Sequence, residues 1–321
     1  MASSTPAQIS RPDGWSLLRR NRTALLSLYT LGFLALAALV GPMLMPEELK
    51  STSDAQFLPP QSAGHVLGTD LNGQDLFYRL LSGARVSLGI GVAGAFLSLV
   101  IGTLYGMVSG YAGGKVDAFM MRATEVLQSV PRILFIMILI AALDDRVKDA
   151  LDAARLWAQE AKWPAMEGFF RDAIPYSRIL VMILSLGIVE WLTMARIVRG
   201  QVLVLREMTF VTASRAMGQS PWGVLKKHLL PNLSTIILTY LTLTIPAVIL
   251  DESFLSFLGL GIEDPAASWG SLLKDGAQVI NPLDSKWWLL LFPALGMSVS
   301  LLALNFLGDG LRDAFDPKSG D

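Results

Sequence analysis

The chain has 321 residues, of which 52% are hydrophobic and only 17% are charged, and its formal net charge is −1. A soluble domain usually carries about 25% charged residues, so the composition favours a membrane protein, and the near-neutral charge gives no reason to expect nucleic acid as a partner. The lack of cysteine excludes disulfides and thiolate chemistry. His65 and His228 are too far apart in the sequence to form a metal-ligand motif, so we expect no metal site.

Six apolar stretches are long enough to cross a membrane, since a helical span needs roughly 20 residues. The predicted spans are residues 24–45, 85–111, 119–143, 178–199, 232–258 and 287–308, with approximate ends. The first stretch is longer than the apolar region of a cleaved signal peptide, and it follows Arg19, Arg20 and Arg22. Basic residues stay on the cytoplasmic side. We therefore predict an all-α polytopic membrane protein with six transmembrane helices and with both termini in the cytoplasm.

Glycines recur along the second predicted span. Gly102, Gly106 and Gly110 are spaced four apart, which places them in one stripe on a helix. Glycine permits two helices in lipid to approach closely, so this stripe predicts a tight helix contact, within this chain or with a partner subunit. Such stripes are common in membrane helices and carry no information about the substrate.

The third predicted span is polar in its first half, and Pro131 predicts a bend. Arg122 and Glu125 stand three residues apart and can pair on one face of a helix. Two interpretations remain open for them: an ion pair at the cytoplasmic interface, or a role in lining a gate or pathway.

The outer segment 144–177 follows the third span. Its pattern from Asp144 to Lys162 predicts an amphipathic helix that ends before Pro164. This helix either packs on the outer face of the protein or adds a docking surface for an external partner.

The connection at 200–231 is too polar to span a membrane but is regularly patterned. A short helix ends at Gly218 by the usual glycine stop, and Ser220 caps a second helix with Pro221 at its first position. The second helix leads to Pro231, where the fifth span begins. Two short helices that meet at a glycine predict a compact cytoplasmic projection that fits the groove of another protein.

Asp251 and Glu252 lie near the outer end of the fifth span. Carboxylates at this depth are costly unless they are hydrated or paired. They are either interfacial residues with structural hydrogen bonds, or gate and pathway residues that contact an external partner or the amino end of a solute.

The connection at 200–231 resembles the EAA loop of the permeases of binding-protein-dependent ABC importers, in which Glu-Ala-Ala, three residues, Gly, nine residues and Ile-x-Leu-Pro follow one another. The pattern falls on Thr212-Ala213-Ser214, then Arg215, Ala216 and Met217, then Gly218, and finally His228 to Pro231. The glutamate and the second alanine are replaced, and His228 stands in place of the isoleucine. In this form the loop resembles the peptide-permease branch of the family.

Three other segments resemble the same branch, namely LGTDLNGQDLFYRLLSGARVSLGIG (67–91), ESFLSFLGLGIEDPAASWGSLL (252–273) and NFLGDGLRDAFDP (305–317). The resemblance implies the type I ABC importer permease fold and the shorter of the two permeases of dipeptide, oligopeptide or nickel importers. It divides the chain into an N-terminal region, 1–66, with the first span, and a permease core, 67–317, that carries the outer insert.

The same resemblance implies the partners: a homologous permease subunit, two ATPase subunits that grip the loop at 200–231, and an extracytoplasmic solute-binding protein, all at the inner membrane. The chain contains no G-x-x-x-x-G-K-[ST] phosphate loop, because Gly114-Lys115 is followed by Val116. We therefore expect ATP and Mg²⁺ to be bound by the partner subunits, with no cofactor and no enzymatic activity in this chain. The alternative function is an ion-coupled secondary transporter or channel. Such a protein is expected to have internal inverted repeats and charged residues deep in several of its spans. The substrate itself stays open.

Overall fold

The computed structural model describes residues 18–19, 21–62, 64–263, 266–281 and 284–315. In these ranges the chain forms helices and loops, without a named β-strand. The predicted N-terminal tail up to residue 17, Arg20, and the last residues of the C-terminal signature, Asp316-Pro317, lie outside the described residues.

Five helices are long and apolar enough to cross a membrane by themselves. They are α2 (Arg22–Leu44), α4 (Leu76–Ala112), α8 (Ser177–Leu205), α11 (Leu230–Phe257) and α13 (Trp288–Phe315). A bent pair, α5 (Gly114–Gln128) and α6 (Arg132–Glu160), gives a sixth span if the two are counted as one. The all-α polytopic fold is thereby confirmed, with five spans, or six if the bent pair is one span.

Local capping decides where the helices begin. The Asn21 side chain accepts a hydrogen bond from the backbone N–H of Ala24 at 3.2 Å, which starts α2 close to the predicted position. Asp75 accepts from the N–H of Tyr78 at 2.9 Å, so α4 begins at Leu76, well before the predicted residue 85. The polar residues ahead of the apolar run therefore belong to the same helix.

The predicted third span, 119–143, is not one gently bent helix. The axes of α5 and α6 differ by 89° at a short break, residues 129–131. Proline removes a backbone donor and disfavours the helical conformation of the residue before it, so Pro131 ends α5 and then serves as the N-terminal flank of α6.

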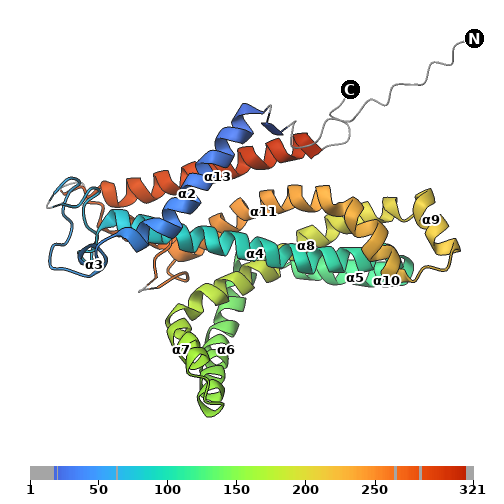
Figure 1. Ribbon diagram of the computed structural model, residues 1–321, viewed down its shortest axis with the longest axis horizontal. Helices are drawn as coiled ribbons and strands as arrows, with labels where there is room; N and C mark the ends of the chain where they lie inside the picture. The colour runs from blue at the N-terminus through green and yellow to red at the C-terminus, as the bar shows by residue number, and fades with distance from the viewer. Residues whose placement is uncertain (1–17, 20, 63, 264–265, 282–283, 316–321) are drawn as a thin grey trace, which may run out of the picture.

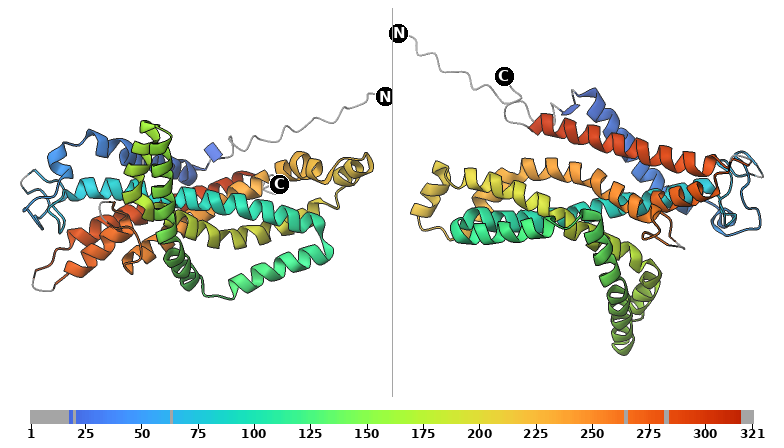
Figure 2. Two further views of the ribbon diagram at one scale, coloured as in Figure 1. Left: turned by 90° about the horizontal axis from the view of Figure 1, so that it is seen from below. Right: turned by 180° about the vertical axis from the view of Figure 1, so that it is seen from behind.

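The predicted outer helix, 144–162, is not a separate element. Residues 132–160 form one continuous helix, because no glycine or proline interrupts the run. Lys162, at φ +56°, turns the chain into α7 (Pro164–Ala173), which packs back on α6, and η1 (Ile174–Tyr176) leads into α8. The α6–α7 hairpin projects away from the helix bundle (Figures 1 and 2). An ion pair of 2.9 Å between Asp144 and Arg178 holds its base.

The bundle is organised around α4 and α8, which lie side by side, and α2 packs with α13 on another side (Figure 1). At one end of the bundle are α3 (Glu47–Lys50) and the loop that follows it; at the other end are α9 (Thr209–Ala216) and α10 (Pro221–Val224). The main apolar core is formed by residues of α4, α6, α8 and α11, such as Ile90, Ile136, Leu186 and Val248.

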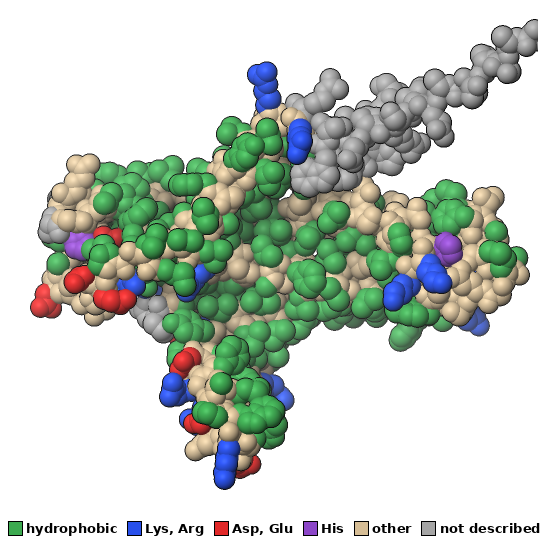
Figure 3. Space-filling model, viewed as in Figure 1, with side chains coloured by type: hydrophobic (Ala, Val, Ile, Leu, Met, Phe, Trp, Pro, Cys, Tyr) green, Lys and Arg blue, Asp and Glu red, His purple; other side chains and the backbone are tan. Residues whose placement is uncertain are grey.

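Large apolar side chains also cover the outside of the bundle, as expected for helices that face lipid. Phe33, Phe96 and Leu302 are all at least half exposed. In the space-filling view, hydrophobic side chains cover the middle of the bundle, and charged ones gather at its ends and on the hairpin (Figure 3).

Candidate functional site

The loop that resembles the EAA motif forms two short helices at the free end of the bundle (Figure 1). The first, α9, ends before Gly218, whose φ of +81° is a backbone conformation that favours glycine. Ser220 then caps α10: its hydroxyl accepts a hydrogen bond from the N–H of Gly223 at 3.2 Å. The chain continues without a break through η2 (Leu225–Leu229) into α11. The loop is therefore a rigid extension of the α11 span.

One side of the loop is anchored in the bundle. Val211, Val224 and Leu229 are completely buried, and they pack in one apolar cluster with Val198 and Val202 of α8. Burying such side chains contributes about 1.5–3 kcal/mol each, so the loop resists bending away from the helices that carry it.

Side-chain hydrogen bonds through Gln219 join α9 to η2. The Ser214 hydroxyl donates to the side-chain oxygen of Gln219, and the same oxygen lies 3.0 Å from Nε2 of His228. Arg215 places its guanidinium 4.6 Å from the centre of the Tyr111 ring on α4. His228, which stands in place of the motif's isoleucine, thus connects η2 to the turn at Gly218.

The opposite side of the loop is exposed. The side chain of Met217 is 82% exposed and that of Trp222 is 60% exposed. The other exposed residues of this face are Thr212, Ala213, Ala216 and Pro231. Exposed apolar residues that are rimmed by polar ones indicate a protein interaction surface. We name Ala213, Met217 and Trp222 the exposed loop face.

Below the loop, an ion pair connects α5 to α8. The Arg199 guanidinium donates two hydrogen bonds of 2.6 Å to the Asp117 carboxylate, and the Ser109 hydroxyl donates a third of 2.6 Å. Arg206, at the end of α8, donates to the carbonyl oxygen of Gly110 at 3.0 Å. A two-pronged arginine contact fixes direction as well as distance. The base of the loop is thereby fixed to α4 and α5.

The glycine stripe of the second span lies against α8 of the same chain. A Cβ atom added to Gly106 would lie 2.5 Å from the carbonyl oxygen of Ala195, and one added to Gly110 would lie 2.9 Å from that of Arg199. Gly102 is equally close to α8. Contacts this short require glycine, and they place the backbones of α4 and α8 against each other.

The four acidic and basic residues considered as gate or pathway residues lie in three different places. Arg122 and Glu125 form an ion pair of 3.1 Å on the exposed surface of α5, where the two side chains are 79% and 55% exposed. Exposed pairs of this kind contribute little to stability, about 0–1 kcal/mol. They do not come near Asp251 or Glu252, which lie on α11.

Glu252 is fully buried between α4, α11 and α12 (Trp269–Val279). Its carboxylate accepts hydrogen bonds from the hydroxyls of Ser256 at 2.7 Å, Ser87 at 3.0 Å and Ser253 at 3.3 Å. The N–H of Trp269 donates to the same Ser87 at 3.1 Å. In this structure the Glu252 carboxyl group faces serine hydroxyls in the interior, and these hydrogen bonds hold α12 against the bundle.

Asp251 forms part of an ionic cluster that links three helices. Arg132, at the start of α6, contacts both Asp251 of α11 and Glu190 of α8. The carboxylate side chains are only 18% and 10% exposed. Charges at this depth in a membrane protein usually face protein or a water-filled cavity and mark functional positions.

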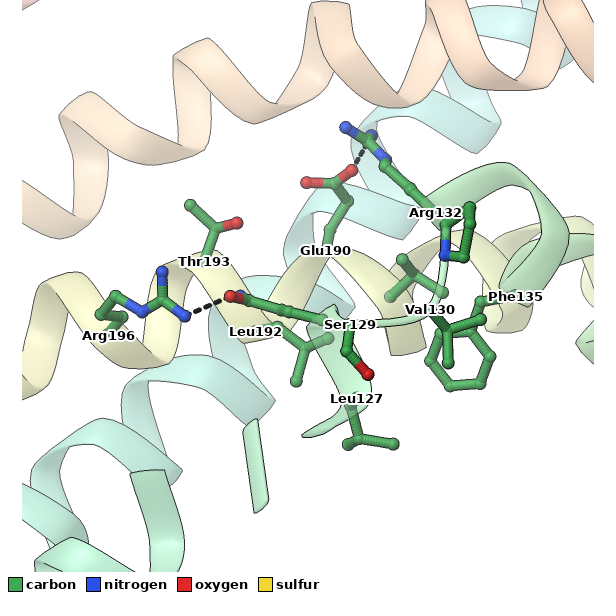
Figure 4. A pocket seen from close by; sticks show the side chains of 12 residues that line it. Leu127, Ser129, Val130, Arg132, Phe135, Glu190, Leu192, Thr193 and Arg196 are labelled. Carbon is green, nitrogen blue, oxygen red and sulfur yellow. Dashed lines mark hydrogen bonds and ion pairs between the residues drawn. The ribbon is translucent and has the colours of Figure 1, made fainter. Parts of the chain in front are cut away.

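A pocket of about 400 Å³ opens beside this cluster, at the break between α5 and α6 (Figure 4). In the close-up, Arg132 points toward Glu190, and Arg196 points toward a side chain at the end of α5. The pocket is lined by Leu127, Gln128, Ser129, Val130, Pro131, Arg132, Phe135, Val189, Glu190, Leu192, Thr193 and Arg196. Its mixture of apolar walls and a few charges is typical of ligand pockets.

Sequence reasoning missed Glu190 and Asp117. The signal for Glu190 was its position as a lone carboxylate inside the apolar run of the fourth span, where a charge indicates function. Asp117 gave no such signal, because it lies near the end of a helix where acidic residues are ordinary. In the described ranges, no group of three or more His, Cys, Asp or Glu residues could hold a metal ion.

Two family models match the chain. Residues 102–320 match the model described as the inner membrane component of binding-protein-dependent transport systems. Residues 13–60 match the N-terminal transmembrane domain of oligopeptide transport permease C. The first match includes the charged pocket and the loop at 200–231.

Curated relatives match almost the full length. The dipeptide transport system permease protein DppC of Bacillus subtilis is 40% identical over 307 residues, 95% of this chain and 85% of the relative. The oligopeptide transport system permease protein OppC of Escherichia coli K12 is 42% identical over 310 residues, 95% of this chain and 91% of the relative. The OppC protein of Haemophilus influenzae is 39% identical over 301 residues, 93% of this chain and 86% of the relative.

Proposed function

This chain belongs to the inner membrane components of binding-protein-dependent transport systems, and we propose that its exposed loop face receives the movement of partner ATPases that drives peptide transport. It is a multi-pass inner-membrane permease of the dipeptide and oligopeptide ABC importer family. The members of this family are transport permeases and not catalytic subunits.

The assembly that we propose has four kinds of component. This chain pairs with a homologous permease subunit to form the pathway, and two ATPase subunits bind ATP and Mg²⁺. An extracytoplasmic solute-binding protein delivers the peptide. The loop at 200–231 and both termini lie in the cytoplasm. Neither ATP nor Mg²⁺ binds this chain, which carries no phosphate-loop sequence.

One observation carries the proposal: the loop is stiff on one side and apolar and exposed on the other. Met217 and Trp222 leave their apolar surface open, whereas Val211 and Leu229 are completely buried against the bundle. A surface of this design gains free energy when a partner's groove covers it. The anchored side then transmits any displacement to the spans.

The displacement has a continuous path through the molecule. η2 and α11 form one uninterrupted helical run, so a movement of the loop tilts α11. The Arg199–Asp117 contact and the close packing of Gly106 on α8 carry the same movement to α4 and α5. At the other end, Glu252 connects α11 to α12. A displacement of the loop therefore moves α11 and, through Glu252, α12 at the outer end of the bundle.

Co-purification tests this proposal. The tagged chain is expressed with its cognate permease and ATPases, and the ATPases retained on the affinity resin are measured. We expect Met217→Glu to lose them, because the groove would have to bury an unpaired carboxylate. Val66→Glu is the matched control, since Val66 is 63% exposed at the opposite end of the bundle. ATPases that stay bound to Met217→Glu, or that never bind the wild-type chain, would contradict the proposal.

A further inference from the structure

The pocket at the break between α5 and α6 carries two unbalanced charges of opposite sign. We propose that it binds a short peptide in its zwitterionic form, with the peptide's ammonium group at Glu190 and its carboxylate at Arg196. This inference rests on the proposed function in peptide transport, and it assigns a substrate contact to residues of this permease.

The negative end of the pocket lies at Glu190, where two carboxylates, those of Glu190 and Asp251, meet a single cation, Arg132. Glu190 and Asp251 come from different spans and share one guanidinium, that of Arg132. No second Lys, Arg or His among the described residues forms an ion pair with either carboxylate. With both carboxyl groups ionised, two carboxylates and one guanidinium leave one net negative charge. Because the carboxylates are largely shielded from water, an added cation is strongly attracted.

The positive end of the pocket is formed by Arg196, whose side chain lines it (Figure 4). Its guanidinium donates a hydrogen bond to the side-chain oxygen of Gln128, which carries no charge. In the part of the chain that the structure describes, no carboxylate forms an ion pair with Arg196. A planar guanidinium with free donors fits a carboxylate well.

The distance between the two ends sets the length of the ligand. Glu190, Thr193 and Arg196 follow one another at intervals of three residues on α8, and all of them line the pocket. At 1.5 Å per residue, Glu190 and Arg196 are separated by about 9 Å along the helix. An extended chain spans about 3.3–3.6 Å per residue. A peptide of roughly two or three residues therefore reaches both ends.

The pocket places no strong demand on the peptide's side chains. Its walls include Leu127, Val130, Phe135 and Leu192, which offer apolar surface without further charges. Ser129 and Thr193 also line the pocket, and their hydroxyl oxygens can accept hydrogen bonds from the peptide's backbone N–H groups. A site that binds the two charged termini of a peptide and does not select among its side chains accepts peptides of many sequences.

The cluster has one competing use, as a latch that holds α6, α8 and α11 together in a single conformation. Removing a charge from a latch alters the transport of every peptide by the same factor. Removing a charge from a binding site alters only peptides that possess the complementary end. Blocking one end of the peptide therefore separates the two uses.

The experiment measures equilibrium binding of radiolabelled trialanine, N-acetyl-trialanine and trialanine amide. The protein is the complete importer, with both permeases and the ATPases, in lipid nanodiscs without the solute-binding protein, so that only the membrane complex binds. The variants are Glu190→Gln and Arg196→Gln. Asp152→Asn and Arg155→Gln are the matched controls, because they remove the same charges from an ion pair of 2.8 Å on the α6–α7 hairpin. Peptide uptake into vesicles is measured with the same proteins and the binding protein present.

We expect Glu190→Gln to weaken trialanine and trialanine amide by roughly ten- to a hundredfold, as for one charged hydrogen bond, and to leave N-acetyl-trialanine unchanged. Arg196→Gln should weaken trialanine and N-acetyl-trialanine and leave the amide unchanged. The controls should bind as the wild type does. Equal effects on all three peptides would overturn the site and indicate a latch. The site is also overturned if wild-type nanodiscs bind no peptide although the vesicles take it up. A wild-type importer that takes up no peptide would instead refute the proposed function.

Discussion

At the scale of single residues, the short distances in this protein explain why particular side chains are small or charged. Gly106 permits a helix contact that a methyl group would block, and the Asp117 carboxylate accepts three hydrogen bonds of 2.6 Å. The spacing of the glycines was sufficient to predict a close contact. The sequence could not predict the partner helix, because helices far apart in the chain meet only through the tertiary fold.

Two glycines of the same helix give a matched test of the α4–α8 contact. We predict that Gly106→Ala destabilises the assembled complex by about 1–3 kcal/mol, because the added Cβ would collide with a backbone oxygen that cannot move away. Gly89→Ala should be neutral or stabilising by up to about 1 kcal/mol, since nothing lies within 4 Å of its added Cβ. The measurement is thermal inactivation of the complex in mild detergent. Equal inactivation temperatures for the two variants would show that the α4–α8 contact does not determine the stability of the complex.

At the scale of helices, the apolar runs predicted which segments cross the membrane, and the capping residues explain where the predicted ends were wrong. Asp75 moves the start of α4 to Leu76. The third span shows the limit of reasoning from sequence: Pro131 predicted a bend, but the direction of α6 after the 89° turn also depends on its packing against α8. The continuous helix at 132–160 was missed because its apolar half and its amphipathic half looked like two elements.

The α6–α7 hairpin can be shortened without disturbing the bundle. We predict that replacing residues 152–172 with a short glycine linker leaves membrane insertion and ATPase association intact. The reason is that Val147 and Leu151, which pack on the main core, are kept together with the Asp144–Arg178 ion pair at the base. The measurements are membrane fractionation and co-purification of the ATPases.

The same deletion also separates the two interpretations of the hairpin. A docking surface for the solute-binding protein implies weaker stimulation of ATP hydrolysis by that protein, and a merely covering hairpin implies unchanged stimulation. Replacement of residues 147–151 by alanines is the control for the base of the hairpin, because it removes the side chains that pack on the main core and should therefore disturb the bundle. A deletion variant that fails to insert would contradict both interpretations.

At the scale of the whole molecule, three functional regions lie at different positions along the helix bundle. The exposed loop face lies at one end, the charged pocket lies beside the break in the middle, and α12 is fixed by Glu252 toward the other end. The turn at Gly218 and the helix cap at Ser220 could be predicted, but the boundaries of the loop were wrong: α8 continues to Leu205, and the helix that begins at Pro221 runs without a break into α11. The pocket could not be predicted, because its charges come from α6, α8 and α11 and meet only in the folded chain.

The central claim is that the loop transmits work from the ATPases to the spans, and the most direct test measures uptake and ATP hydrolysis in the same reconstituted vesicles. For Ala213→Asp we predict normal insertion, loss of peptide uptake, and loss of the ATP hydrolysis that substrate and binding protein stimulate, because the new carboxylate would be buried without a partner. Val66→Asp, at the opposite end of the bundle, should behave as the wild type does. Full uptake by Ala213→Asp with the ATPases still bound would contradict the account and would mean that coupling uses another surface.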